Sequence, residues 1–289
     1  MLVHVLIPVF NRLPMTKAVL DCLRAQISVD LNIVVIDDGS SDGTNAFLEA
    51  QEDVTILHGD GSLWWGGAID RGLRHVLPKA ASTDYVLFLN NDTEFEPDFV
   101  LNLVMASKRN NHAAVGSIIR NTQPPHEILS IGPKVDYWRF AVWDLLATDA
   151  GKAALAENAD INVPMLSGRG SLYPVEAFAK AGFMRPCILP HYFADYELAD
   201  RVRRSGIRVI VSCSAVVYST PEWGNNPRRF SWWKRWFSKR SASNLFFTLA
   251  FWSLVGSPIQ RCTAVPRWIF FKALRSFQQY RDSQVWGRG

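Results

Sequence analysis

Apolar segments and helical patterns alternate regularly along the first 119 residues of this 289-residue chain. Five short apolar segments are typical of buried strands, and they occupy residues 3–8, 33–36, 54–57, 85–89 and 114–119. The spacing of apolar residues between most of them predicts helices at 15–25, 44–51, 68–76 and 98–108. Strands joined by helices in this way form parallel sheets covered on both faces. We therefore predict an α/β fold with a doubly wound, mostly parallel sheet.

Polar side chains follow several of these strands. The segment 85–89 ends in Asn90, Asn91 and the acid Asp92. In open α/β sheets ligands bind beyond the carboxyl ends of the strands, so an acid at this place suits a metal ion or a phosphate-bearing substrate. An acid that caps the following helix is the alternative. The turns at 37–43 and 59–67 follow two other strands, and we expect them at the same edge of the sheet as Asp92.

The usual nucleotide-binding motifs are missing from the sequence. It contains neither GxGxxG at the first turn nor GxxxxGK[ST] anywhere, so a dinucleotide-binding fold of the common type and a P-loop enzyme are not supported. Asp38 ends a strand in the segment IDDGSSDG, and such an acid can hydrogen-bond a ribose or a base. An ordinary strand-to-helix turn capped by Ser41 is the alternative. A nucleotide would have to be held by acids and a cation.

Composition places the chain among globular proteins. With 48% apolar residues, its length fits one large domain or one domain with an appendage. The four cysteines lie far apart and form no CxxC, which indicates a reducing compartment rather than a disulfide framework or a zinc site. The first apolar segment has no basic leader and is ended by Pro8, which argues against a signal peptide. We therefore expect the protein in the cytoplasm.

The C-terminal part differs from the rest in charge. Residues 228–281 hold eleven Lys or Arg and no Asp or Glu. Because the whole chain has a net charge of +4, the remaining residues carry a net charge of −7 (4 − 11). Trp and Phe are interleaved with these basic residues, and the apolar segment 245–256 is shorter than the ~20 residues that span a bilayer. The pattern predicts amphipathic helices that lie on the inner face of the cytoplasmic membrane. A helical hairpin packed on the body is the alternative, and the apolar surface also suits a homodimer. No nucleic-acid-binding motif accompanies the basic residues, so we expect no nucleic-acid partner.

Four segments carry a resemblance to a known family. They are LIPVFNR at 6–12, VVIDDGSSDGT at 34–44, LFLNNDTEF at 87–95 and FADYELADRVRRSG at 193–206. In order and spacing they resemble family-2 glycosyltransferases of the GT-A fold. This resemblance implies a glycosyltransferase domain at 1–225, with a nucleotide-sugar half at 1–120 and an acceptor half at 121–225, followed by the tail at 226–289. The segments 59–72 and 189–197 resemble enzymes of bacterial surface-polysaccharide synthesis, including rhamnosyltransferases, so dTDP-rhamnose and a UDP-hexose are both compatible donors.

The resemblance also assigns roles to residues. It implies that Asp92, as the last acid of a DxD-type motif, ligates Mg²⁺ or Mn²⁺ at the donor diphosphate. It implies that Asp195, in an ED-type motif, is the general base that activates a hydroxyl of a glycan or lipid-linked glycan for inverting transfer. The residues expected to line the donor are Pro8, Val9, Asn11, Arg12, Asp38, Gly61, Trp65, Gly67, Asn91 and Asp92. The chain departs from the family in three places: Asn90 replaces an acid, Ala194 replaces another, and Tyr218 and Ser219 stand where many relatives have a metal-binding His.

Further predictions come from the residues themselves. Asp195 shares a helical face with apolar residues at 198, 199 and 202, so we expect it at a helix start, facing inward. Of the two tryptophans in the loop at 59–67, we expect Trp64 to fill the core and Trp65 to lie near the donor. The predicted acceptor residues are Arg169, His191 and Tyr192, although a plain β-turn also explains the polar break around Arg169.

Two other functions remain compatible with the sequence. A sugar nucleotidyltransferase also uses acids at the ends of strands and would have no need of Asp195. A catalytically inactive nucleotide-binding module would explain the reduced metal motif.

Overall fold

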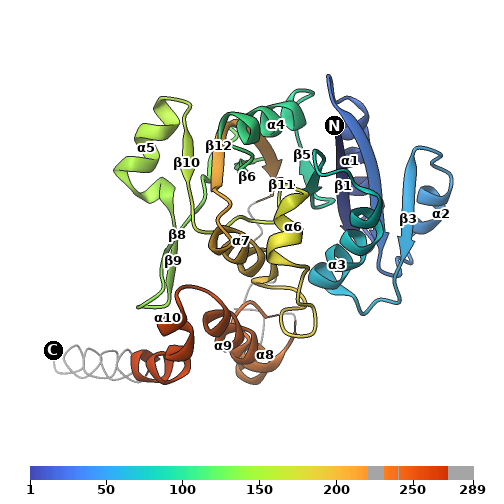
Figure 1. The fold of residues 1–289 in the computed structure, drawn as a ribbon. Coiled ribbons are helices and arrows are strands. Elements are labelled where there is room, and N and C mark those ends of the chain that lie inside the picture. The colour runs from blue at the N-terminus through green and yellow to red at the C-terminus, as the bar shows by residue number, and fades with distance from the viewer. Residues whose placement is uncertain (221–230, 240, 273–289) are drawn as a thin grey trace.

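A single mixed sheet forms the centre of the computed structural model, which describes residues 1–220, 231–239 and 241–272 (Figure 1). Its main strands, in spatial order, are β10 (Asp160–Asn162), β12 (Val209–Ser219), β6 (Ala114–Asn121), β11 (Ser171–Pro174), β4 (Tyr85–Phe88), β1 (Leu2–Val9), β2 (Asp30–Asp37) and β3 (Val54–His58). Two short strands extend it, because β5 (Thr93–Glu94) pairs with β12 and β7 (Ile128–Ser130) pairs with β6. A separate hairpin joins β8 (Pro133–Asp136) to β9 (Ala141–Asp144).

The predicted parallel sheet is confirmed for the N-terminal half. Strands β4, β1, β2 and β3 run parallel to one another, and β6 runs parallel to β12. Strand β11 is the exception, since it lies between β4 and β6 and is antiparallel to both. Its first residue, Ser171, therefore pairs with Phe88 at the end of β4. This inversion brings the polar segment 167–170 to the edge of the sheet that carries Asp92.

Helices cover both faces of the sheet. On one face lie α1 (Leu13–Arg24), α2 (Thr44–Glu49) and α4 (Phe99–Arg109). On the other lie α3 (Trp64–Val76), α6 (Glu176–Ala181) and α7 (Ala194–Arg204), whereas α5 (Asp149–Ala156) stands beyond the β10 edge. Strand β1 shows why two cores form, because Val5 and Ile7 point into one core and Leu6 into the other. This alternation follows from the two-residue period of a strand.

The prediction for the start of α3 was wrong. The helix begins at Trp64 rather than at residue 68, so both tryptophans belong to its first turn and not to a loop. The cause is Asp38, whose carboxylate accepts hydrogen bonds from the backbone N–H groups of Leu63 and Trp64. A carboxylate at a helix N-terminus satisfies donors that have no partner within the helix. Since Asp38 lies 26 positions before Trp64, no local pattern reveals this cap.

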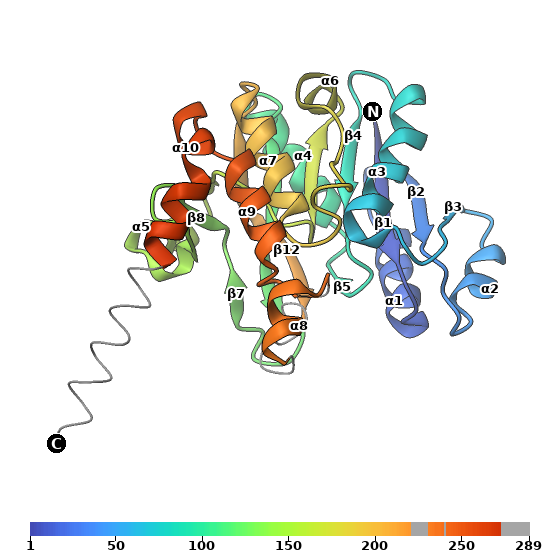
Figure 2. The same cartoon turned by 90° about the horizontal axis from the view of Figure 1, so that it is seen from below.

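The C-terminal helices pack on the body, which supports the alternative of a packed hairpin for this part of the tail. They are α8 (Trp232–Phe237), α9 (Leu245–Leu254), α10 (Pro258–Cys262) and the helical residues 264–272, and α9 lies beside α7 in both views (Figure 2). Phe251 of α9 is fully buried and stacks on Phe193, with ring centroids 4.7 Å apart. Phe247 and Trp252 belong to the same core as α7. The basic residues at 228, 229, 240, 275 and 281 lie outside the described residues. Within them, no helix has the length and apolar character needed to cross a bilayer.

Candidate functional site

The loop after β4 holds the acid predicted to bind a metal. Asn91 is buried and its amide donates a hydrogen bond to the Thr16 hydroxyl of α1, at 3.2 Å. Asp92 follows, and its Oδ2 accepts a hydrogen bond of 3.3 Å from the guanidinium of Arg12. The other oxygen, Oδ1, is buried and has no hydrogen-bond partner among the described residues. One oxygen of the carboxylate is therefore available to a ligand.

The residues around Asp92 fit a divalent metal ion only if a substrate completes its coordination. In the described part of the chain no three His, Cys, Asp or Glu side chains gather in a metal-binding group. Strand β12 ends beside this loop, where Ser219 pairs with Thr93, and the buried Ser219 hydroxyl has no hydrogen-bond partner in the described chain. Mg²⁺ is commonly held by one or two carboxylates, several waters and substrate phosphates. The free oxygen of Asp92 meets that requirement.

The turn after β1 is joined to the turn after β2. Asn11 and Arg12 have left-handed backbone angles, with φ of 59° and 69°. The Asn11 amide oxygen accepts a hydrogen bond from the backbone of Ser41, and its backbone N–H donates one to the Ser40 hydroxyl. Arg12 precedes α1 and extends from this turn to Asp92. The structure thus brings the predicted residues of this turn to one place, together with Asp92.

Three of the predicted donor residues have structural roles in the described contacts. The side chain of Val9 is 2% exposed and lies in the core, and its carbonyl accepts the backbone N–H of Asp38. Asp38 itself is 6% exposed, and besides the start of α3 its carboxylate holds the backbone N–H of Gly61. Gly61 has a φ of 87°, which disfavours other residues. Contact of Val9, Asp38 and Gly61, and of the half-buried Pro8, with a nucleotide stays a prediction.

The prediction that Trp64 fills the core was wrong, because Trp64 is half-buried and lines the cleft between α3 and the C-terminal helices. Trp65 packs against the core, where its ring meets Phe88 edge-on at 6.1 Å. Its indole Nε1–H donates a hydrogen bond of 2.8 Å to Oδ1 of Asn90, two residues before Asp92. The same ring lies against Gly168, where any side chain would overlap it. Trp65 therefore connects α3 with the Asp92 loop and with the segment 167–170. Its contact with a donor stays a prediction.

Asp195 is the second residue of α7 and faces inward, as predicted. Its Oδ2 accepts a hydrogen bond of 2.8 Å from the backbone N–H of Gly168, and its Oδ1 accepts one of 2.9 Å from the backbone N–H of Tyr196. Burial raises the pKa of the Asp195 carboxyl above the ordinary aspartate value, and these two hydrogen bonds and the charge of Arg169 oppose that rise. A carboxyl with a raised pKa, close to the positive charge of Arg169, is suited to accepting a proton.

The two acids belong to one connected site. Asp195 is bonded to Gly168, Gly168 packs on Trp65, and Trp65 is bonded to Asn90 in the loop of Asp92. Each contact joins segments that are far apart in the sequence. Gly168 is the functional position that the sequence reasoning missed, because it acts through its backbone N–H and its missing side chain. Its only sequence signal is the small-residue segment SGRGS at 167–171.

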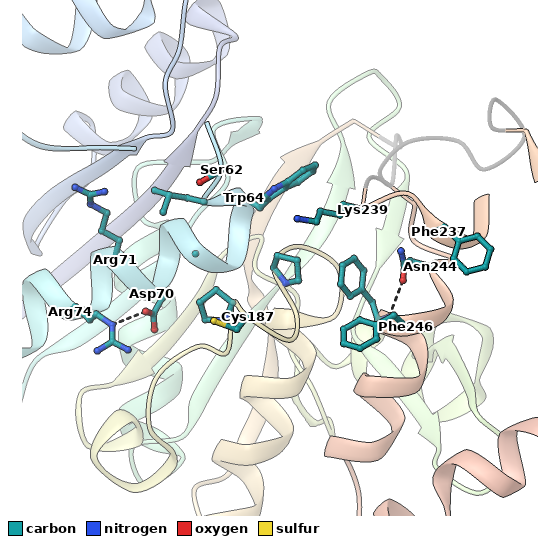
Figure 3. Close-up of a pocket in the computed structure, with 15 residues that line it drawn as sticks. Ser62, Trp64, Asp70, Arg71, Arg74, Cys187, Phe237, Lys239, Asn244 and Phe246 are labelled. Carbon is teal, nitrogen blue, oxygen red and sulfur yellow. Dashed lines mark hydrogen bonds and ion pairs between the residues drawn. The ribbon is translucent and has the colours of Figure 1, made fainter. Parts of the chain in front are cut away.

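A cleft of about 780 Å³ opens beside this site, between α3 and the C-terminal helices (Figure 3). Trp64 lines it and also contacts His191, with ring centroids 5.8 Å apart. The N–H of Gly66 donates a hydrogen bond of 2.7 Å to the Pro190 carbonyl and so joins α3 to the segment of Pro190. The other lining residues are Ser62, Leu63, Gly67, Asp70, Arg71, Arg74, Pro186, Cys187, Pro190, Phe237, Lys239, Asn244, Phe246 and Phe247. Neither Asp92 nor Asp195 lines the cleft, so it adjoins the acids and does not contain them.

The predicted acceptor residues His191 and Tyr192 lie between the cleft and Asp195. Their rings meet edge-on at 4.5 Å. Burial lowers the pKa of His191 to about 4, so the imidazole is neutral at physiological pH. Its Nδ1 is buried and has no hydrogen-bond partner among the described residues. Contact of these two residues and Arg169 with an acceptor stays a prediction.

Comparison with known proteins identifies the class. The signature of "Glycosyl transferase family 2" matches residues 4–181, from β1 to the end of α6. The structure is similar to that of GalNAc-T7 solved with UDP, GalNAc and Mn²⁺, with a TM-score of 0.58 and 12% identity over 76% of this chain and 44% of that one. It is also similar to S. aureus TarS 1-349, with a TM-score of 0.55 and 15% identity over 76% of this chain and 60% of that one.

The sheet and its helices are those of a GT-A fold. This chain belongs to glycosyl transferase family 2. It spans less than two thirds of the length of these two solved proteins. The family match ends before α7, so Asp195 lies outside it.

Proposed function

We propose that this protein transfers a sugar from a nucleotide-diphosphate donor to a hydroxyl group of a glycan or lipid-linked glycan, with inversion at the anomeric carbon. The observation that supports this most is the connection of Asp195 to the Asp92 loop through Gly168 and Trp65. A base and an acid that faces a diphosphate must act on opposite sides of one sugar carbon in a single displacement. Short contacts hold the start of α7, with Asp195, to the loop of Asp92, so the two acids can act on opposite sides of one carbon.

In the proposed step the acceptor oxygen forms a bond to C1 of the sugar while the bond from C1 to the diphosphate oxygen breaks. The acceptor proton passes to the Asp195 carboxylate, and the electron pair of the broken bond stays on the nucleoside diphosphate. General base catalysis of this kind typically contributes ~10²- to 10⁴-fold in rate. The two backbone N–H groups on Asp195 fix its orientation and oppose the rise in pKa that burial causes.

Asp92 is the residue proposed to hold a divalent metal ion, Mg²⁺ or Mn²⁺. When bound, such an ion supplies positive charge to the departing diphosphate. Arg12, which bonds to the other oxygen of Asp92, adds a second positive charge at the same place. We propose Pro8, Asn11, Asn91 and Gly67, with Asp38 and Trp65, as the residues that shape the donor site.

The acceptor is proposed to approach along the cleft beside α3. Trp64 and His191 connect this cleft with the segment that precedes Asp195. Lys239 and Arg71 bring positive charge to its walls (Figure 3). Sugars commonly lie against aromatic rings, and acidic or phosphate-linked glycans are attracted by such cations. The narrower resemblance supports dTDP-rhamnose or a UDP-hexose as the donor and bacterial surface polysaccharide as the product.

The C-terminal helices are proposed to rest on the inner face of the cytoplasmic membrane. Their buried face packs on α7, and their other face exposes large apolar side chains, among them Ile259 at 67%, Ile269 at 56% and Phe270 at 62%. Lysine and arginine residues accompany them in the sequence. Apolar side chains flanked by cations bind the interface of anionic bilayers. This location would bring the enzyme to a lipid-linked acceptor.

A donor screen tests the proposed activity. The protein is incubated with dTDP-rhamnose, UDP-glucose, UDP-galactose or UDP-GlcNAc, with a lipid-linked or free oligosaccharide, and with Mn²⁺ or Mg²⁺. Release of the nucleoside diphosphate is measured, and proton NMR gives the anomeric configuration of the product. We expect release with one donor, dependence on the metal, and an inverted product. A retained anomeric configuration would contradict the proposed displacement.

A further inference from the structure

A second pocket lies at the far end of α7 from Asp195. It has a volume of about 580 Å³ and sits where α7 meets the start of α10. Arg203 is eight residues from Asp195, which is about 12 Å along a helix axis. The pocket therefore stands apart from the proposed donor site. The residues that line it are Tyr137, Arg203, Arg204, Gly256, Ser257, Pro258, Gln260 and Arg261.

Positive charge dominates this pocket. Three arginines line it, and no acidic residue of the described chain does. Asp200 lies beneath them, fully buried, and pairs with Arg203 at 2.7 Å and with Arg204 at 2.8 Å. The same carboxylate also accepts hydrogen bonds from the Tyr137 hydroxyl and the Gly256 backbone. Its single negative charge compensates one of the three guanidinium groups, so a net positive charge remains.

Two of the arginines have donors without partners. The Nε–H groups of Arg203 and Arg261 are both buried, and neither has a hydrogen-bond acceptor among the described residues. A buried donor without an acceptor is costly, and the cost is larger when the donor carries charge. Guanidinium groups are planar forks that match the oxygens of a phosphate. The pocket thus combines excess positive charge with donors that lack an acceptor.

We propose that this pocket binds a phosphate group. Arg261 provides a guanidinium that no carboxylate neutralises in the described structure, and Arg203 is held in place by Asp200. The phosphate belongs either to the headgroup of an anionic phospholipid or to a soluble phosphate compound. Ile259, which is 67% exposed, lies on α10 between the lining residues Pro258 and Gln260. An exposed apolar side chain next to the pocket suits the lipid source.

Two binding measurements on the full-length protein distinguish these sources. Flotation with vesicles of phosphatidylcholine and phosphatidylglycerol, compared with phosphatidylcholine alone, reports binding to a lipid phosphate. Isothermal titration with inorganic pyrophosphate in EDTA reports binding of a soluble phosphate, and EDTA excludes metal-assisted binding at Asp92. The test variant is Arg261→Gln. The control is Arg208→Gln, which removes one exposed arginine outside the pocket and changes the net charge equally.

The expected result is a loss of about tenfold or more in affinity for Arg261→Gln and little change for Arg208→Gln. A loss confined to anionic vesicles identifies a lipid headgroup, and a loss of pyrophosphate binding identifies a soluble phosphate. Arg203→Lys keeps a positive charge beside Asp200 but removes the planar guanidinium group, so it should weaken the same binding. Equal binding by wild type and Arg261→Gln in both measurements would overturn the proposal. Because neither measurement requires sugar transfer, failure here and failure of the proposed function are distinguishable.

Discussion

The indole N–H of Trp65 donates a hydrogen bond of 2.8 Å to the side-chain oxygen of Asn90. This bond crosses from the first turn of α3 to the loop that follows β4. Gly168, whose backbone holds Asp195, packs against the same ring. One aromatic ring therefore connects the loop that carries Asp92 with the segment that holds Asp195.

Replacing Trp65 by Phe tests this role. The shorter ring keeps apolar contact with Phe88 but removes the N–H that reaches Asn90. We expect a loss of roughly 0.5–1.5 kcal/mol in the free energy of unfolding, the usual net contribution of a hydrogen bond, and a severalfold lower turnover because the Asp92 loop is less well positioned. Thermal unfolding and donor turnover measure the two effects. Trp143→Phe, at a tryptophan 38% exposed on β9, is the control. Equal turnover of Trp65→Phe and wild type would contradict the positioning role.

Substitution of Asp195 by Asn should remove a pH-dependent contribution to stability. Since burial raises the pKa of this carboxyl in the folded state, its ionised form is disfavoured there. The contribution of Asp195 to stability is therefore present below the ordinary aspartate pKa and is lost as the pH rises through the raised value. An amide at this position loses one of the two backbone hydrogen bonds at every pH, so only the pH dependence reports on the carboxyl. We expect the Tm of Asp195→Asn relative to wild type to be higher at pH 7 than at pH 4. The exposed Asp30, changed to Asn, is the control. A Tm difference that is the same at pH 7 and pH 4 would speak against a raised pKa.

His191 should make the protein sensitive to mild acid. Its pKa is lowered to about 4 by burial, whereas an unfolded histidine titrates near 6.5. Between these values the unfolded chain binds the extra proton, so stability is present above pH 6.5 and falls as the pH drops toward 4. His191→Gln removes this proton linkage. We expect its Tm to fall less than that of wild type between pH 7 and pH 5.

The control for His191 is the exposed His58, changed to Gln. That variant should follow the wild-type pH dependence. If His191→Gln and wild type lose the same number of degrees over this range, the imidazole is not buried in solution as it is in the structure.

Two phenylalanines of the C-terminal helices should respond in opposite ways. Phe251 is fully buried against Phe193, so Phe251→Ala should cost about 3–5 kcal/mol in the free energy of unfolding. Phe270 is 62% exposed, so Phe270→Ser should leave the Tm nearly unchanged and reduce binding to anionic vesicles. Urea unfolding and vesicle flotation measure both. An unaffected stability in Phe251→Ala would mean that α9 does not share the core. Unchanged flotation of Phe270→Ser would remove this residue from the membrane contact.

The fold of the N-terminal half was predictable because its information is local. Strand β1 is a nearly continuous apolar segment, as expected of a parallel strand buried on both faces, and the turns after β1 and β2 carry polar residues where the sheet ends. Asp195 was predictable as an inward-facing residue, since its helical face is visible in the spacing of α7. The sequence also predicted that the turns at 37–43 and 59–67 lie at the same edge as Asp92. The bonds of Asn11 to Ser40 and Ser41, of Arg12 to Asp92 and of Gly61 to Asp38 confirm this.

The remaining features depend on contacts between distant residues. The start of α3 is set by Asp38, and the position of Trp65 is set by Gly168 and Asn90. The residues next to Trp64 and Trp65 in the sequence indicate neither these contact partners nor how far away they lie in the chain. In the C-terminal part, α9 is apolar on all sides, so its letters do not say which face meets the body. Only packing against Phe193 and its neighbours decides that face.

The most direct test of the central claim is a single-turnover assay of Asp195→Asn. The enzyme is supplied in excess over a limiting amount of donor, with saturating acceptor and Mn²⁺; donor affinity is measured separately by titration, and transfer of the sugar is followed in time. The account predicts that donor affinity is kept within a few-fold while the rate of transfer falls ~10²- to 10⁴-fold, because the base is lost and the donor site is not. Transfer by Asp195→Asn at the wild-type rate, with activity abolished only by Asp92→Ala, would contradict the role of Asp195 as the base.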